Sequence, residues 1–174
     1  EQNGWIDIKD WEAIKKVNND TTGLWFFNSG PLAGASQPHR HFQLLRRDPS
    51  EVSCPREKWI LEFCNVNYKN VSFCKNIIIK KFSNFINEEN MHEIYKDLLF
   101  ELGLGKPETD KKPRYPYNLI FTDKWILLIK RKTDNLLGFS INALGFAGYI
   151  LVTERSNIRY LKKYGPEKLL ENFL

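Results

Sequence analysis

The most regular hydrophobic pattern in the chain covers Glu88 to Leu102, where apolar residues recur at intervals of three and four positions. Such spacing places apolar side chains along one face of an α-helix. The apolar positions of this stretch are Met91, Ile94, Tyr95, Leu98, Leu99 and Leu102. Asn87 is a suitable N-cap and Gly103 a suitable C-terminal stop for this helix. A shorter run with three-residue spacing, Asp10 to Val17, predicts a second amphipathic helix.

Other apolar runs have the short length and the branched or aromatic composition of β-strands. We expect strands at Leu24–Phe27, from about His39 to Leu45, and around Ile77–Ile79. Asn118–Thr122 and Trp125–Ile129 are separated by two polar residues, and they predict a β-hairpin. Hairpin strands together with scattered helices indicate an α+β fold with a largely antiparallel sheet and flanking helices.

The remaining segments have weaker or interrupted patterns. Ser50 to Asn70 shows no clear period. Residues 103–116 are charged and rich in proline, so we expect a linker or surface loop there, and this is the best position for a gap in the chain. Ala143–Val152 predicts a helix whose two glycines indicate that another element or a ligand packs very close. Asn157–Leu174 predicts two short helices, broken at Gly165-Pro166.

Length and composition fit an ordinary globular protein. With 174 residues, of which 42% are hydrophobic, the chain is long enough to bury a core, and we treat residues 1–174 as one domain. The net charge of +5 favours an anionic partner. Its basic residues form dispersed pairs, so a nucleotide is favoured over a nucleic acid. No run reaches about 18 consecutive apolar residues, so no membrane partner is expected.

Three cysteines, Cys54, Cys64 and Cys74, stand ten residues apart. This spacing is too wide for the paired ligands of common zinc motifs, and an odd number of cysteines does not suit a disulfide framework. We therefore expect reduced thiols, which are typical of the cytoplasm.

Two of the three histidines, His39 and His41, stand two positions apart, and Gln43 follows two positions later. On an extended strand alternate residues face the same side, so these three side chains would project together. Arg40 would face the other way. A pair of imidazoles beside an amide is a candidate catalytic group.

The segment before the histidines carries little side-chain bulk, with Gly30, Gly34, Ala35 and Ser36 in one short loop. Small residues allow backbone N–H groups to approach a bound anion closely. The preceding strand would deliver Asn28 to the start of this loop. Together with the imidazole pair, the loop indicates phosphoryl or nucleotidyl chemistry.

Taken alone, two histidines in alternate positions have three explanations: a polar surface pair, part of a metal site, or a nucleophile with its neighbour. A metal site needs a third ligand, and His92 is a poor candidate because it lies on the predicted helix. The small-residue loop, Asn28 and Gln43 favour the nucleophile.

The run from Asn28 to Gln43 reads Asn-Ser-Gly-x3-Gly-Ala-Ser-Gln-x-His-x-His-x-Gln. It closely resembles the diadenosine tetraphosphate phosphorylases, also called ATP adenylyltransferases. They belong to the galactose-1-phosphate uridylyltransferase branch of the histidine triad superfamily, in which a glutamine replaces the third histidine. The resemblance recurs at Tyr117–Thr122, Trp125–Arg131, Ser140–Gly148 and Tyr164–Pro166. It implies a histidine-triad-like fold.

The resemblance also implies roles for the three side chains of the histidine run. In the family the central histidine is the nucleophile, which corresponds to His41. The backbone carbonyl of the first histidine, here His39, holds the other ring nitrogen of the nucleophile. The glutamine, here Gln43, donates to an oxygen of the α-phosphate. Because an amide is a poor general acid, it suits a leaving group such as ATP that needs little protonation.

The reaction implied by the resemblance is a two-step transfer. The histidine takes AMP from diadenosine tetraphosphate and releases ATP, and inorganic phosphate then removes the AMP as ADP. Asn28, Gly34, Ala35 and Ser36 are the expected substrate-binding residues, and they donate hydrogen bonds to the phosphates. No tightly bound cofactor or protein-held metal is expected, although a divalent cation such as Mg²⁺ would accompany the polyphosphate.

Family members carry a further N-terminal half, and we expect this chain to lack it. Three alternative functions stay open on sequence grounds. One is a hexose-1-phosphate uridylyltransferase, which shares the pattern of two alternate histidines and a glutamine. The others are a non-catalytic nucleotide-binding module and a metal-dependent hydrolase.

Overall fold

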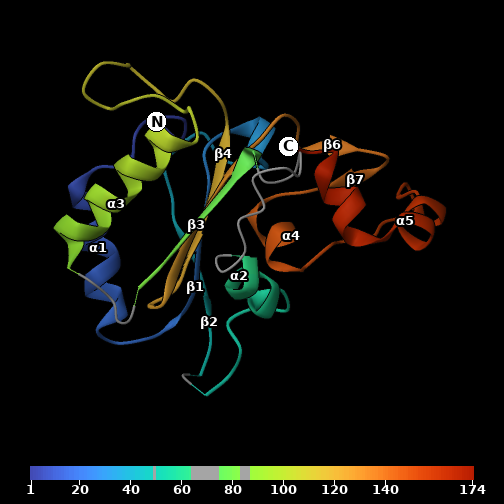
Figure 1. Ribbon diagram of the computed structural model, residues 1–174, viewed down its shortest axis with the longest axis horizontal. Helices are drawn as coiled ribbons and strands as arrows, with labels where there is room; N and C mark the ends of the chain where they lie inside the picture. The colour runs from blue at the N-terminus through green and yellow to red at the C-terminus, as the bar shows by residue number, and fades with distance from the viewer. Residues whose placement is uncertain (49, 64–74, 83–86) are drawn as a thin grey trace.

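A five-stranded sheet forms the centre of the computed structural model, which describes residues 1–48, 50–63, 75–82 and 87–174 (Figure 1). Its strands are β1 (Gly23–Asn28), β2 (Gln43–Arg46), β3 (Ile77–Lys81), β4 (Tyr117–Phe121) and β5 (Trp125–Lys130). The order across the sheet is β2-β1-β4-β5-β3, and each neighbouring pair is antiparallel. The expectation of a largely antiparallel sheet is confirmed.

The expected hairpin is the centre of this sheet. β4 and β5 pair from Tyr117 opposite Lys130 to Phe121 opposite Ile126. Both strands are buried almost throughout, because helices cover both faces of the sheet. Their sequences therefore read as continuous apolar runs rather than as alternating ones.

One face of the sheet is covered by α1 (Ile8–Asn18) and α3 (Glu88–Glu101), which lie side by side in Figure 1. Trp11 of α1 is fully buried at the centre of this layer. Its ring centroid lies 5.3 Å from that of Phe121 on the sheet and 6.0 Å from that of Tyr95 on α3. The two helices predicted by periodicity are thus confirmed, and the side chain of Asn87 caps α3 by accepting from the N–H of Asn90.

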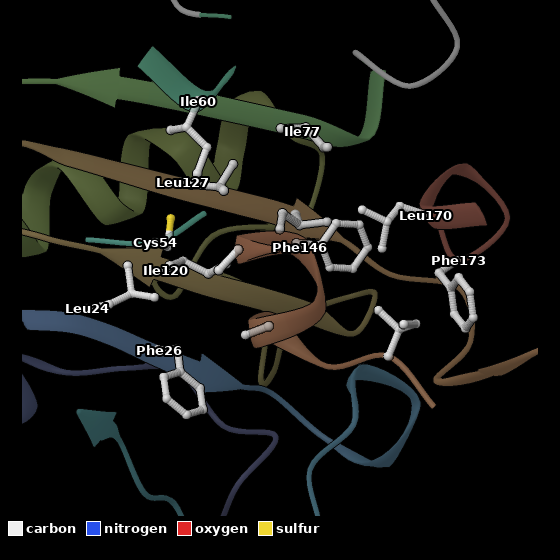
Figure 2. Close-up of a cluster of buried hydrophobic side chains, with 14 of the residues drawn as sticks. Leu24, Phe26, Cys54, Ile60, Ile77, Ile120, Leu127, Phe146, Leu170 and Phe173 are labelled. Carbon is white, nitrogen blue, oxygen red and sulfur yellow. The ribbon is translucent and has the colours of Figure 1, made fainter. Parts of the chain in front are cut away.

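The opposite face is covered by the remaining elements. These are α2 (Glu57–Phe63), α4 (Ala143–Ala147), α5 (Ile158–Glu171) and a small hairpin of β6 (Asn135–Leu136) and β7 (Phe139–Ser140). Figure 2 shows Phe146 of α4 between the sheet residues Ile120 and Leu127 and the C-terminal residues Leu170 and Phe173. This second cluster anchors α4 close to the end of β1.

In this half of the fold one expectation was wrong, and one element was not predicted. The helix predicted for Ala143–Val152 ends at Ala147 because Gly148 adopts a left-handed conformation with φ +109°. A Cβ atom on Gly148 would lie 2.9 Å from Cβ of Pro55, so the close packing inferred from the glycines is present. No element was predicted within Ser50–Asn70, where the structure has α2. A helix of seven residues is too short to establish a period.

The other expectations hold within the described residues. Gly165, with φ +80°, breaks the C-terminal helix as predicted, and residues 103–116 form a loop. Cys54 is buried with a free thiol, while Cys64 and Cys74 lie outside the described residues. No helix in the described part of the chain is long and apolar enough to cross a membrane.

His92 on α3 predicts a pH dependence of stability. Its Nδ1 is buried without a hydrogen-bond partner among the described residues. Burial lowers the pKa of the His92 ring below 6.5, and Lys96 acts in the same direction. The unfolded chain therefore binds the proton more tightly. We expect the free energy of unfolding to be highest above pH 6.5 and to decrease as the pH falls from 6.5 toward the folded-state pKa.

Urea unfolding between about pH 5 and 8 of the wild type and of His92→Gln measures this contribution. The difference between the two pH profiles isolates His92 from the other histidines. An equally steep loss of stability on acidification in both proteins would contradict the prediction.

Candidate active site

A short loop connects β1 to the two candidate histidines through a 3₁₀ helix, η1 (Pro31–Ala33). Gly34 follows it with φ +86°, and a Cβ atom on Gly34 would lie 2.6 Å from Cβ of Asn142. Both the backbone conformation and the lack of space require glycine here. The loop is thereby packed against the residue that caps α4, because the side chain of Asn142 accepts from the N–H of Leu144.

The N–H groups of this loop differ from the expectation. The N–H of Gly34 donates to the carbonyl of Pro31 at 2.8 Å, and that of Ala35 donates to the carbonyl of Gly30 at 3.0 Å. Neither is therefore free to bind an anion in this structure. Ser36 is exposed, and among the described residues its N–H and its hydroxyl have no partner. Of the three expected residues, Ser36 is the one with open donors.

The strand expected from about His39 to Leu45 begins only at Gln43. Extending the register of β1 and β2 would set Asn28 opposite His41. The side chain of Gln2 lies between them instead. Its Nε2 donates to the carbonyl of Asn28, and its Oε1 accepts from the N–H of His41 at 3.0 Å. Because a side-chain amide bridges the two backbones, the chain before Gln43 is separated from β1.

His41 is oriented by its neighbour in the chain. Its Nδ1 lies 3.0 Å from the carbonyl oxygen of His39. A carbonyl oxygen only accepts, so this contact assigns the ring hydrogen to Nδ1 and leaves the lone pair of the neutral ring on Nε2. The centroid of the His39 ring lies 5.4 Å away, and that ring is exposed. The contact implied by the family resemblance is therefore present.

Arg40, between the two histidines, faces away from them as expected. Its guanidinium donates to the carbonyl of Trp5 and to the carboxylate of Asp7, at 3.1 Å, and lies 3.2 Å from that of Asp10. Arg40 thus anchors the histidine segment to the start of α1, and its charge is directed away from a ligand at His41.

Gln43 and Asn28 project on the side of the sheet that carries α4. Gln43 lies opposite Phe26, and residues directly opposite in an antiparallel pair share a face. Phe26 belongs to the buried cluster of this side. Asn28, two positions further along β1, shares the side of Phe26, and its Oδ1 accepts from the N–H of Ala143 at 2.9 Å.

Behind Asn28 the core holds further polar side chains. Oδ1 of Asn28 also accepts from Nδ2 of Asn118 at 2.7 Å, and Oδ1 of Asn118 accepts from the guanidinium of Arg131. Asn118 is fully buried, and Arg131 is 2% exposed. The Oδ1 atom of Asn28 is thus committed to the scaffold, whereas its Nδ2 has no hydrogen-bond partner among the described residues.

A hollow of about 440 Å³ opens beside the loop, lined by residues 1–3, 30–31 and 35–38. Its volume lies within the range of known small-molecule sites, roughly 300–1,000 Å³. Ser36 is part of its wall, so the open donors of this residue adjoin a space that a ligand can enter.

Sequence reasoning missed Gln2, Asn118 and Arg131 as parts of this site. Asn118 is the second residue of β4 and Arg131 directly follows β5, and a polar residue within or beside a buried apolar run is a signal that could have been used. Gln2 carries no such local signal. Among the described residues no three His, Cys, Asp or Glu side chains lie together as a metal site.

Gln2 provides a direct test of this geometry. Replacing Gln2 with leucine, which is similar in size, is expected to lower the free energy of unfolding by about 1–3 kcal/mol. The carbonyl of Asn28 and the N–H of His41 would lose their partner, because the leucine side chain can neither donate nor accept a hydrogen bond. Denaturant unfolding measures the loss, and Gln37→Leu on the exposed part of the loop is the control. Equal stability of the two variants would show that the bridge contributes nothing.

Family models match both parts of the chain. Residues 61–173, more than half of the chain, match the ATP adenylyltransferase C-terminal domain. Residues 1–61 match the Ap4A phosphorylase N-terminal domain. The two models meet inside α2, and the expectation that the family's N-terminal half is missing stays a prediction.

Two curated relatives come from Saccharomyces cerevisiae. Diadenosine 5',5'''-P1,P4-tetraphosphate phosphorylase 2 is 28% identical over 153 residues, which cover 79% of this chain and 47% of the relative. Protein APA1 is 27% identical over 159 residues, which cover 80% of this chain and 48% of the relative. The chain thus spans about half the length of these curated relatives.

Solved structures show the same fold. The crystal structure of yeast Ap4A phosphorylase Apa2 in complex with Ap4A matches with a TM-score of 0.70 and 22% identity, covering 99% of this chain and 63% of that chain. The complex of Apa2 with AMP matches with a TM-score of 0.69 and 21% identity, covering 97% and 62%. The fold expected from the resemblance is confirmed.

Proposed function

We propose, because the chain belongs to the ATP adenylyltransferase family, that it carries the active site of a nucleotidyltransferase. The reaction is the cleavage of diadenosine tetraphosphate by inorganic phosphate to ATP and ADP. The observation that carries the proposal is the contact between Nδ1 of His41 and the carbonyl of His39, which leaves Nε2 as the nucleophilic atom. The substrate class follows from the relatives, which include a diadenosine tetraphosphate phosphorylase and Apa2 in complex with Ap4A.

The first step forms a bond between Nε2 of His41 and an α-phosphorus of the substrate. The bond from that phosphorus to its bridging oxygen breaks, and its electron pair leaves with the oxygen as ATP. AMP stays on the ring. The hydrogen on Nδ1 remains directed at the carbonyl of His39, which stabilises the positive charge that the ring gains.

In the second step inorganic phosphate is the nucleophile, and the bond between His41 and phosphorus that formed in the first step is broken. An oxygen of inorganic phosphate attacks the phosphorus of the bound AMP, the bond to Nε2 breaks, and its electron pair returns to the ring. The product is ADP. His41 is thereby restored to its neutral form with the hydrogen still on Nδ1.

Donors on the same side of the sheet stabilise the charge of the phosphates during both steps. Gln43 donates from its exposed side-chain amide, and Asn28 donates from the Nδ2 that the scaffold leaves open. Ser36 adds its N–H and its hydroxyl. Gly34 and Ala35 act by keeping the loop thin and close to α4, since their N–H groups are occupied.

We assign no tightly bound cofactor to this chain. A divalent cation such as Mg²⁺ would enter with the polyphosphate and neutralise part of its charge. Its ligands in the proposal are the phosphates. We also propose a cytoplasmic location, because the number and spacing of the cysteines favour reduced thiols.

The test combines intact mass with product analysis. The protein is incubated with diadenosine tetraphosphate in the absence of phosphate, and its mass is measured. We expect an added AMP on the wild type and none on His41→Gly. Subsequent addition of phosphate should remove the added mass and release ADP.

Two further conditions separate the alternatives. A UDP-hexose offered in place of the dinucleotide would add UMP if the chain were a uridylyltransferase. Binding of AMP without any covalent addition would identify a non-catalytic module. The same test is then applied to a longer natural chain that contains this sequence. If that chain also binds AMP but forms no covalent adduct, the proposal is overturned.

A further inference from the structure

The geometry points to Arg131 as a positioning residue that fixes, through Asn118, the orientation of the side-chain amide of Asn28. Arg131 lies at the end of β5, in the core behind the site, and it does not need to touch a ligand. The inference deepens the proposed function and rests on it for its catalytic consequence, because Asn28 is one of the proposed phosphate-binding residues.

Arg131 is held in the core on all sides. Its guanidinium lies over the rings of Phe146 and Phe173, 4.9 and 5.7 Å from their centroids. It donates to the carbonyls of Thr133 and Ile141 at 2.6 and 2.7 Å and to that of Phe173 at 3.3 Å. Among the described residues it forms no ion pair within 4.0 Å. The position of the guanidinium is therefore fixed by backbone carbonyls and aromatic rings rather than by a carboxylate.

A buried arginine of this kind is costly to maintain, because removing its charge from water is unfavourable. Burial lowers the pKa of Arg131 to about 10, which is still well above neutral pH. The group is therefore protonated under physiological conditions and can only donate hydrogen bonds.

Arg131, Asn118 and Asn28 form a row of hydrogen-bonded side chains, and the direction of each hydrogen bond in this row follows from the arginine donor. Because Arg131 only donates, Asn118 must turn its Oδ1 toward it. Nδ2 of Asn118 then faces Oδ1 of Asn28 and the carbonyl of Ala33, at 2.7 and 2.8 Å. Oδ1 of Asn28 also accepts from the N–H of Ala143. Nδ2 of Asn28 is left to donate outside the scaffold.

The orientation matters because the two ends of an amide have opposite effects on an anion. A phosphate beside Nδ2 gains a hydrogen bond from a donor, whereas a phosphate beside Oδ1 meets a partial negative charge. The carbonyl of Ala33 and the N–H of Ala143 act in the same sense as Arg131. Arg131 supplies the charged donor at the far end of the row.

Hydrogen exchange of the side-chain amides, followed by NMR, tests the orientation without any activity. In the wild type the amide hydrogens of Asn118 are bonded and those of Asn28 are not, so Asn28 should exchange at least about tenfold faster. In Asn118→Asp the new carboxylate keeps Arg131 paired and accepts from Asn28. The Asn28 hydrogens should then become protected by a similar factor. Unchanged exchange of Asn28 in Asn118→Asp would overturn the inference.

Arg131→Met removes the donor and keeps an apolar side chain in the core. We expect Asn118 to lose protection by about tenfold or more, because its orientation is no longer fixed from one side. If Arg131→Met does not fold, Asn118→Asp still tests whether the side chain paired with Arg131 fixes the amide of Asn28. A folded Arg131→Met protein with full protection of Asn118 would show that Arg131 has no positioning role.

Binding of AMP tests the functional consequence. Asn28→Ala and Asn118→Asp should each weaken AMP binding by about 10- to 100-fold, the effect of losing one hydrogen bond to a charged group. Once Asn28 is alanine, Asn118→Asp should have little further effect. Asn135→Asp, which adds the same charge at an exposed position, is the control.

The outcomes separate the two proposals. Asn118→Asp is compared in the wild type and in Asn28→Ala. If it weakens AMP binding equally in both, the effect does not act through Asn28, and the positioning role is overturned. Absence of AMP binding by the wild type would count against the proposed function. The exchange measurements would then still decide whether Arg131 fixes the amide.

Discussion

Replacing His41 with alanine is expected to lower the rate of diadenosine tetraphosphate phosphorolysis by about 10⁴-fold or more. The imidazole is the proposed nucleophile, and alanine offers no group in its place that could form the bond to phosphorus. Binding of AMP should change much less, because Asn28, Ser36 and Gln43 remain. Formation of ATP and ADP under single-turnover conditions, together with the Kd of AMP, measures the two effects separately.

His39→Ala is the matched control. The structure uses the backbone carbonyl of His39, which alanine also provides, so the rate should fall far less than in His41→Ala. His41→Gly adds a second arm, since free imidazole can occupy the space left by the ring and restore part of the turnover. If His39→Ala lost as much activity as His41→Ala, the assignment of the nucleophile to His41 would be wrong.

Replacing Trp11 with alanine is expected to lower the free energy of unfolding by about 3–5 kcal/mol, a large part of the total stability of a typical domain. Trp11 is fully buried between α1, α3 and the sheet, so the change leaves a cavity where its ring contacts those of Tyr95 and Phe121. Its ring also lies 6.4 Å from that of Phe42, the residue that follows His41. Chemical denaturation measures the loss.

Two controls accompany this prediction. Trp11→Phe keeps much of the packing, and the Nε1 it removes has no hydrogen-bond partner among the described residues, so the loss should be roughly 1–3 kcal/mol. Phe100→Ala removes an aromatic ring that is 61% exposed and should change stability by about 1 kcal/mol or less. A loss in Trp11→Ala no larger than in Phe100→Ala would contradict the assigned role of Trp11.

The elements that sequence predicted well are those whose local signals agree. α3 has a clear period, a capping asparagine and a glycine stop, and β4 and β5 are apolar runs joined by a short polar turn. In each case the residues that determine the element lie within it. The same is true of the Nδ1 contact of His41, which joins residues two positions apart and follows from the family resemblance.

The failures have causes that the pattern of residue types along the chain does not show. β2 begins at Gln43 because Gln2, more than forty positions earlier, takes the place of a ladder partner of His41. The N–H groups of Gly34 and Ala35 are occupied because η1 folds the loop onto itself, which composition alone does not reveal. Asn118 and Arg131 are polar residues at apolar runs, but their places in the sequence do not show that the two meet behind Asn28.

The order of the sheet has a consequence for how copies of this protein interact. Within the described residues β2 and β3 are its two edges, and edge strands offer unpaired backbone groups to other chains. Both strands are short, and they carry exposed charged side chains, Arg46 on β2 and Lys80 and Lys81 on β3. Pairing two such edges would bring like charges together. The positive charge that suits a polyphosphate ligand therefore also opposes aggregation through the sheet.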